Sequence, residues 1–249
     1  MFTRLLVGLD GSDGAAAALA AAIELGRRFH STVLLAAVAG EAAAAAARAQ
    51  ALLDAAAREV RSHGLVAETA VASGDPEEQL LRLLQQAEAL VVGRRGEEHG
   101  GSRSLGDTTV RLVRRAPKPV LVAGETVSSF REPVVAYDGG ETSGNALVLA
   151  ARYAEAAGVG LDVVHVSADA ATASELLAKA GAFLSGQPVS FVTHHLTGEP
   201  ATAIAAHIAG TGADLLVAGA HGGRRRSWPM GSTAEALLGA TGVPVIIHR

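Results

Sequence analysis

Cysteine is absent from this chain, and aromatic residues make up only 3% of its 249 residues. Without cysteine the protein has no disulfides, no thiol catalysis and no cysteine-ligated zinc or iron–sulfur cluster. Lysine is almost absent too, since it occurs only as Lys118 and Lys179, and neither follows a glycine. A phosphate-binding loop of the Walker type is therefore excluded.

The charge and hydropathy patterns exclude further classes of protein. The formal net charge is −4, whereas a nucleic-acid-binding protein normally carries a basic excess. No apolar run is long enough to span a membrane, and Met1–Asp10 lacks the pattern of a secretory signal. Because 49% of the residues are hydrophobic, the chain can bury a substantial core. We expect a cytoplasmic protein with no nucleic-acid and no membrane partner.

The sequence contains an internal repeat. Four short landmarks occur twice, in the same order: Arg4–Gly11 and Pro133–Gly139, Gly74–Pro76 and Gly198–Pro200, Ala87–Gly93 and Ala213–Gly219, Pro119–Val122 and Pro244–Ile247. Each landmark returns after about 125 residues, which is the signature of a duplicated unit. We predict two tandem modules, residues 1–125 and 132–249, with the polar stretch Glu125–Glu132 as the linker between them.

Short apolar runs alternate with helical patterns inside each copy. In the first copy the runs expected to form strands are Leu5–Leu9, Thr32–Val38, Leu65–Val71, Leu90–Val92 and Val120–Ala123. Strands that are apolar on both faces are typical of a parallel sheet covered by helices on both sides. The predicted fold class is therefore α/β, with two doubly wound, Rossmann-like modules in tandem, each built on a five-stranded parallel sheet.

Two features of each copy fall where such sheets bind ligands, at the carboxyl ends of the strands. The first is the acid that follows the first strand, Asp10 or Asp138. The second is a glycine-rich loop that leads into a helix, Gly93–Thr108 or Gly219–Thr233. Glycine lets the backbone approach a phosphate closely, and a helix N-terminus offers free N–H groups and a positive dipole end. The pattern predicts a phosphate cradle facing a carboxylate that can accept hydrogen bonds from a ribose or an adenine amine.

Together these landmarks resemble the universal stress protein family, in its tandem form, over nearly the whole chain. The resemblance implies a module of the adenine nucleotide α-hydrolase-like type that binds ATP, with or without Mg²⁺, through this loop. It also implies an adenine contact at the end of the second strand, and His221 lies inside the second loop, where it can touch a nucleotide. The resulting candidate binding residues are Asp10, Val38, Gly93, Gly96, Gly106 and Thr108 in the first copy, and Asp138, Val166, Gly219, His221, Gly222, Gly231, Ser232 and Thr233 in the second.

The two loops depart from the family pattern in different ways. The first keeps nine residues between Gly96 and Gly106 but has Asp107 where the family has serine or threonine. A carboxylate beside phosphates weakens binding by like-charge repulsion. The second loop keeps Ser232 but has only eight residues between its corresponding glycines, and it contains the basic run Arg224–Arg226. On this balance we expect the second module to be the better binder.

Catalytic groups are not evident near either loop. No Gly-x-Ser-x-Gly motif is present, and we find no general base or metal ligands placed for ATP hydrolysis. His194 and His195 are adjacent on a predicted strand, so their side chains point to opposite faces and we expect no metal pair there. We expect an ATP-binding regulatory protein of the stress response with no catalytic residue.

Two alternatives remain open, a nucleotide-independent interaction module of the same fold and a slow ATP hydrolase. The family resemblance further implies that the modules pair through their last strands, Val120–Ala123 and Val245–His248, as an internal pseudo-dimer. Whether such chains also form a homodimer is left open.

Overall fold

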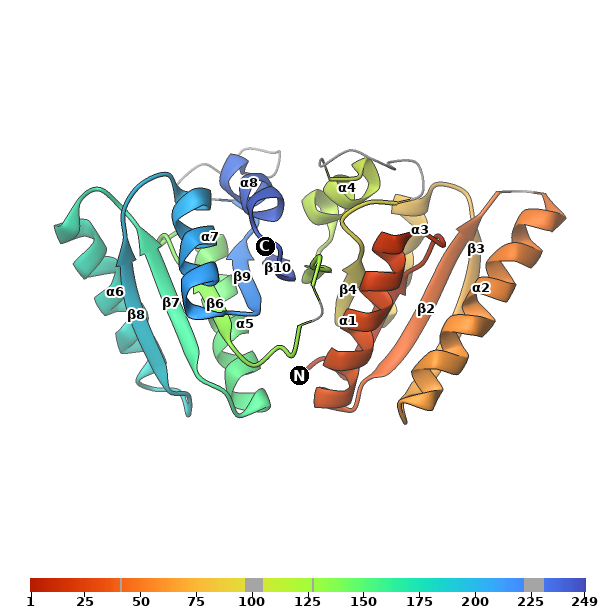
Figure 1. Ribbon diagram of the computed structural model, residues 1–249, viewed down its shortest axis with the longest axis horizontal. Helices are drawn as coiled ribbons and strands as arrows, with labels where there is room; N and C mark the ends of the chain where they lie inside the picture. The colour runs from red at the N-terminus through yellow and green to blue at the C-terminus, as the bar shows by residue number, and fades with distance from the viewer. Residues whose placement is uncertain (41, 97–104, 127, 222–230) are drawn as a thin grey trace. The chain divides into compact units, whose positions relative to one another are not determined.

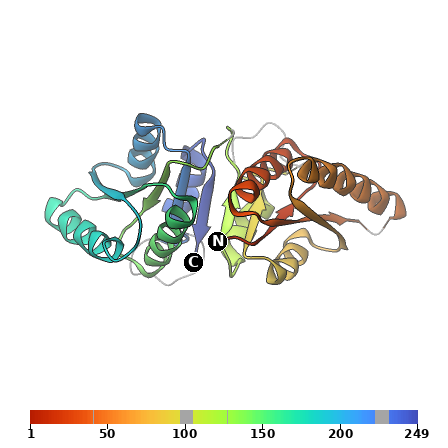
Figure 2. The ribbon, with the colours of Figure 1, turned by 90° about the horizontal axis from the view of Figure 1, so that it is seen from below.

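The computed structural model describes the chain except for residues 41, 97–104, 127 and 222–230. The chain divides into two compact units, which we call the first module (Phe2–Val127) and the second module (Ser128–Arg249). Both are α/β units in which helices lie on both sides of a parallel sheet (Figures 1 and 2). The predicted fold class is therefore confirmed.

The first module has five strands in the order β3-β2-β1-β4-β5, and the neighbouring strands are parallel. Its strands are β1 (Arg4–Gly8), β2 (Thr32–Ala39), β3 (Val66–Ser73), β4 (Ala89–Val92) and β5 (Val120–Val122). Its helices are α1 (Asp13–Phe29), α2 (Ala43–Ser62), α3 (Pro76–Leu83), the short 3₁₀ helix η1 (Leu84–Gln86) and α4 (Asp107–Arg115). The strand order reverses between β1 and β4, so this is the point at which a ligand site is expected.

The second module repeats this arrangement, with the strand order β8-β7-β6-β9-β10 and parallel pairing. Its strands are β6 (Pro133–Ala136), β7 (Leu161–Val166), β8 (Phe191–Leu196), β9 (Leu215–Gly219) and β10 (Val245–His248). Its helices are α5 (Glu141–Ala157), α6 (Ala170–Leu184), α7 (Pro200–Thr211) and α8 (Ser232–Ala240). Right-handed crossovers on this strand order place α5 and α6 on one face of the sheet and α7 and α8 on the other.

The central strands form because their residues are apolar throughout. All four residues of β4 are buried, as are the central residues of β1 and the first four of β9. The outer strands β3 and β8 instead leave many side chains exposed. Helices pack on both faces of the central strands, so each module has one layer of apolar side chains on each side of its sheet.

Local hydrogen bonds fix where the helices begin and end. The Ser12 hydroxyl accepts from the Ala15 amide at 3.1 Å at the start of α1, and the Asp75 carboxylate caps α3 through the Glu78 amide at 3.1 Å. Such caps satisfy amides that have no partner within the helix. At the end of α1, His30 takes a left-handed conformation with φ 53°.

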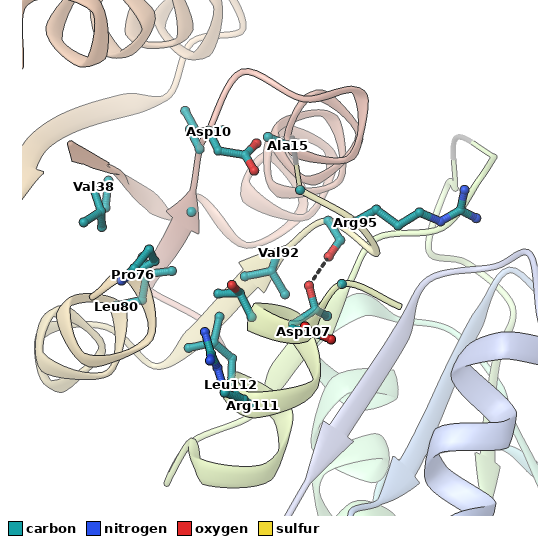
Figure 3. Close-up of a pocket in the computed structure, with 18 residues that line it drawn as sticks. Asp10, Ala15, Val38, Pro76, Leu80, Val92, Arg95, Asp107, Arg111 and Leu112 are labelled. Atoms are coloured by element: carbon teal, nitrogen blue, oxygen red, sulfur yellow. Dashed lines mark hydrogen bonds between the residues drawn. The ribbon is translucent and has the colours of Figure 1, made fainter. Parts of the chain in front are cut away.

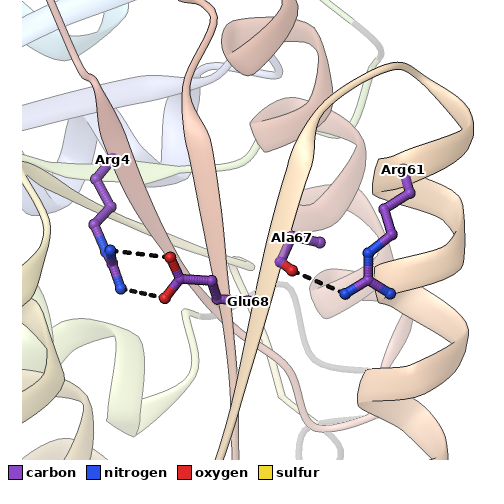
Figure 4. Close-up of polar contacts among 4 residues, drawn as sticks. All are labelled: Arg4, Arg61, Ala67 and Glu68. Carbon is purple, nitrogen blue, oxygen red and sulfur yellow. Dashed lines mark hydrogen bonds and ion pairs between the residues drawn. The ribbon is translucent and has the colours of Figure 1, made fainter.

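Two arginines tie the outer part of the first sheet together (Figure 4). The Arg4 guanidinium donates two hydrogen bonds to the Glu68 carboxylate, at 3.1 and 2.5 Å, across the intervening strand β2. Arg61, near the end of α2, donates to the carbonyl of Ala67 at 2.9 Å. These contacts hold β3 and α2 in place at the sheet edge.

Within the described residues, no helix combines the length and apolar character needed to cross a membrane.

Candidate functional site

A cavity of the first module opens at the carboxyl ends of β1 and β4, where the strand order reverses. Its volume is about 520 Å³, which lies within the range of about 300–1,000 Å³ that small-molecule pockets occupy. All six candidate residues of the first copy line it: Asp10, Val38, Gly93, Gly96, Gly106 and Thr108. The structure therefore brings together residues that are spread over about a hundred positions of the sequence.

The cavity has an apolar side and a polar side (Figure 3). Val38, Pro76 and Leu80 form the apolar side, and Asp107 lies across the cavity from them at the start of α4. The Asp10 carboxylate lies between these two sides. An arrangement of this kind can hold an aromatic ring against the apolar wall and polar groups near the helix N-terminus.

Asp10 is held in a defined position by the turn that follows β1. Its Oδ1 atom accepts from the Ser12 amide at 3.0 Å and from the Ser12 hydroxyl at 2.6 Å. Its Oδ2 atom lies against Gly96, since a Cβ atom at that glycine would come within 2.6 Å of it. Asp10 therefore joins the first strand to the glycine-rich loop.

Gly93 has a packing role that the sequence did not indicate. A Cβ atom at this position would lie 2.3 Å from the carbonyl carbon of Gly14 and 2.4 Å from its oxygen. Conversely, a Cβ atom at Gly14 would lie 2.1 Å from the Arg95 oxygen. The loop after β4 and the first turn of α1 thus pack backbone against backbone, so glycine is required here whether or not a ligand binds.

The charges around α4 are partly balanced by the protein itself. Asp107 occupies the first turn of the helix, where a carboxylate interacts favourably with the helix dipole but opposes a bound anion. Arg111 lines the cavity, yet its Nε lies 3.0 Å from the Glu77 carboxylate, which is only 5% exposed and is also paired with Arg115 at 2.6 Å. Arg95 lines the cavity as well and pairs with Glu125 at 3.6 Å.

The contributions of α3 and of the second turn of α4 to this cavity were not predicted from the sequence. Leu80 and Leu112 form part of its wall, and Arg111 adds a cation. Their helical spacing indicates only which residues face the protein interior, so the sequence contained no separate signal for a binding role. Arg94 of the loop is buried, donates to the Ala123 carbonyl at 3.0 Å, and has its pKa lowered mainly by that burial.

The corresponding cavity of the second module is smaller, about 120 Å³ as enclosed by the described residues. Five of the candidate residues line it: Asp138, Val166, Gly219, His221 and Thr233. Gly231 and Ser232 stand at the start of α8 but are not among its lining residues. Gly222 and the basic run Arg224–Arg226 lie outside the described residues.

Hydrogen bonds organise this second cavity much as they do the first. The Asp138 Oδ1 atom accepts from the Gly140 amide at 2.8 Å and from the Ser143 hydroxyl at 2.6 Å. The Thr142 hydroxyl donates to the His221 carbonyl at 2.6 Å, which fastens the loop to the start of α5. Burial, and secondarily the nearby charge of Arg249, lowers the pKa of His221, so its ring is neutral at pH 7.

Comparison with known sequences identifies related proteins. The sequence profile of the universal stress protein family matches residues 1–124 and 169–249. The universal stress protein Slr1230 of Synechocystis sp. is 30% identical over 173 residues, which cover 65% of this chain and 58% of that relative. The match therefore spans less than two thirds of the relative's length.

Comparison with solved structures finds the same fold across the whole chain. A universal stress protein from Archaeoglobus fulgidus has a TM-score of 0.86 at 20% identity, covering 99% of this chain and 98% of that one. A putative universal stress protein from Pseudomonas aeruginosa has a TM-score of 0.72 at 18% identity, covering 99% and 93%. Because both sequence identities are low, the structural similarity establishes the fold alone.

Proposed function

The chain belongs to the universal stress protein family, and on this premise we propose that it is a regulatory protein that binds an adenine nucleotide in the first-module cavity. The ligand is ATP, with or without Mg²⁺. Binding couples nucleotide occupancy to conformation or to partner contacts under stress. We further propose that the protein acts in the cytoplasm, where this nucleotide is available.

One observation carries this proposal. Six residues predicted from the sequence and from its resemblance to the family line a single cavity of about 520 Å³, at the switch point of a doubly wound sheet. Nucleotides bind to such sheets at this point, because the strand ends and a helix N-terminus converge there.

Each side of the cavity suits one part of the nucleotide. Val38 and Leu80 offer an apolar wall for the adenine ring. The Asp10 carboxylate can accept hydrogen bonds from ribose hydroxyls. Gly106 and Thr108 lie at the start of α4, and Gly96 lies close to Gly106 in the same cavity. Backbone amides and a hydroxyl can donate to phosphates there.

The described geometry favours the first module as the main site, although the sequence pattern favours the second. In the second module the described residues enclose only about 120 Å³, less than the usual lower limit of about 300 Å³ for such pockets. We assign Asp138, Val166 and Thr233 to a secondary site with the same division of roles.

The experiment that tests this proposal uses two matched substitutions, Val38→Trp and Val166→Trp. Val38 is the last residue but one of β2 and Val166 is the last residue of β7, and each lines the cavity of its module. An indole at Val38 fills the apolar side of the first cavity, so we expect Val38→Trp to abolish ATP binding measured by calorimetric titration. We expect Val166→Trp to leave the main binding event in place. The reverse outcome would assign the main site to the second module.

The two alternatives have their own tests. The presence of Asp107 favours the first alternative, an interaction module that has lost nucleotide binding, because the Asp107 carboxylate repels phosphate at the helix N-terminus. In that case neither ATP nor ATP with Mg²⁺ would raise the unfolding temperature. A slow hydrolase would release phosphate from ATP in proportion to protein concentration, and Val38→Trp would abolish that release.

We also propose that the modules pair through β5 and β10 as an internal pseudo-dimer. Each strand is the last one of its own sheet, and both are apolar. Apolar outer strands need a partner or a cover. Slow hydrogen exchange of the amides in β5 and β10 that point away from β4 and β9 would support pairing, and exchange of these amides at the rate of exposed loops would contradict it. The molecular mass measured by light scattering distinguishes a single chain from a homodimer of two chains.

A further inference from the structure

The second module carries a cluster of two histidines and one carboxylate away from its cavity. Asp162 lies on β7, His194 on β8 and His207 near the end of α7. None of the three is among the residues that line the second-module cavity. One ligand atom from each residue lies within 4.8 Å of the other two. We propose that these three residues bind a divalent metal ion, most favourably zinc, and that the bound ion links α7 to β7 and β8.

The distances fit a tetrahedral zinc site. The Asp162 Oδ2 atom lies 3.2 Å from His194 Nε2 and 3.5 Å from His207 Nε2. With Zn–N and Zn–O bonds of about 2.0–2.2 Å, two ligand atoms of a tetrahedral ion lie about 3.3–3.6 Å apart. The imidazole rings are close as well, with centroids 4.6 Å apart. A small movement of these side chains brings all three ligand atoms onto one ion.

The hydrogen bonding of the two rings points to the same conclusion. The Nε2 atoms of His194 and His207 are both shielded from solvent, and neither makes a hydrogen bond. Each lies within ion-pair distance of Asp162 without forming a hydrogen bond to it. Buried polar atoms without a partner are costly and call for an explanation, such as a bound ion. One metal ion would satisfy both nitrogens and the carboxylate together.

The duplicated sequence provides an internal comparison. In the first module the positions equivalent to Asp162, His194 and His207 are Leu34, Ala70 and Leu83, as the strand registers and the matching helix-starting prolines place them. Leu34 and Leu83 are buried at 4% and 6% exposure.

The second module thus has three side chains of metal-ligand type, close together, at positions that are all apolar in the first module. Three such changes at mutually adjacent positions are what a metal site requires. For packing alone they are unfavourable, because the Nε2 atoms of His194 and His207 are buried without a hydrogen bond and burying such polar atoms costs free energy.

The donor set selects the class of ion. Two imidazoles and one carboxylate are ligands that zinc takes in proteins, with a fourth position left for water or another ligand. Calcium and magnesium prefer oxygen ligands throughout. Asp162 also lines a separate cavity of about 190 Å³ at the amino ends of the strands, which provides room for a water ligand and a route of entry.

The test measures zinc binding by untagged, full-length protein, using elemental analysis after dialysis and calorimetric titration. We expect one zinc ion per chain. His194→Ala and Asp162→Asn should each weaken binding more than about 100-fold, because loss of an outer-shell partner alone weakens a site about 10- to 100-fold. His195→Ala is the matched control, since its ring contacts the Ser167 carbonyl at 2.8 Å and not the cluster.

A second variant distinguishes loss of the metal site from misfolding of the module. The triple substitution Asp162→Leu, His194→Ala and His207→Leu copies the side chains of the first module, where Leu34 and Leu83 are buried. We expect it to unfold in EDTA at a temperature no lower than wild type and to gain nothing from zinc, whereas zinc raises the unfolding temperature of wild type. The proposal is overturned if wild type binds no zinc, or if the triple variant binds it as tightly as wild type.

Discussion

Substituting Gly93 by alanine probes the contact between the glycine-rich loop and helix α1. The added Cβ atom would lie 2.3 Å from the Gly14 carbonyl carbon and 2.4 Å from its oxygen. Unstrained carbon contacts are about 3.5–4.0 Å, so one backbone segment must move by more than about 1 Å. Overpacking of a core costs about 1–3 kcal/mol, and occasionally more. We expect a loss of about 3 kcal/mol, because backbone, unlike a side chain, cannot rotate away.

Urea unfolding followed by far-UV circular dichroism measures this loss. Gly40→Ala in the same module is the matched control, since its Cβ atom would meet nothing within 4 Å, and we expect a change within about 0.5 kcal/mol. Gly219→Ala is the equivalent substitution in the second module, where the added Cβ atom would lie 2.6 Å from Thr142 Oγ1. A change within about 0.5 kcal/mol for Gly93→Ala would refute the packing argument and leave phosphate binding as the reason for this glycine.

Three further predictions concern hydrogen bonding, pH and charge. Tyr153→Phe removes the bond of 2.7 Å to the Phe130 carbonyl and should cost about 1–2 kcal/mol in urea unfolding, because a buried carbonyl loses its partner. The His221 ring should titrate below its ordinary pKa of 6.5, mainly because of burial. Its contribution to stability is therefore complete above pH 6.5 and is lost as the pH falls; an NMR titration with a pKa at or above that value would contradict this. Asp107→Ser should tighten ATP binding about five- to tenfold, from about 1 kcal/mol of like-charge repulsion, and unchanged affinity in calorimetry would argue against phosphates at the start of α4.

The fold was predictable because the strands of a covered parallel sheet are apolar on both faces. The observed β2 (Thr32–Ala39) and β4 (Ala89–Val92) match the predicted strands to within one residue at each end. The duplication then determined the second module, since a repeat must repeat its fold. The cap at Asp75 followed from the preference of helix starts for such residues, and its side chain does bond the Glu78 amide.

The candidate site was predictable only in part, because its walls come from segments far apart in the sequence. The strand-end acid and the loop glycines carry local patterns, whereas Leu80 and Arg111 reach the cavity only through the packing of α3 and α4. The histidine cluster was missed for a similar reason. The sequence drew attention to adjacent His194 and His195, but the partner of His194 comes from α7, where His207 reads as an ordinary helical residue.

The most direct test of the central claim is calorimetric titration of ATP with Mg²⁺ into wild type, Val38→Trp and Val166→Trp. We predict binding tighter than about 100 μM in wild type, retained in Val166→Trp and abolished in Val38→Trp. All three proteins should unfold at similar temperatures without nucleotide. Absence of heat and of thermal stabilisation for wild type at about 1 mM ATP would contradict the account, and the protein would then be an interaction module of this family.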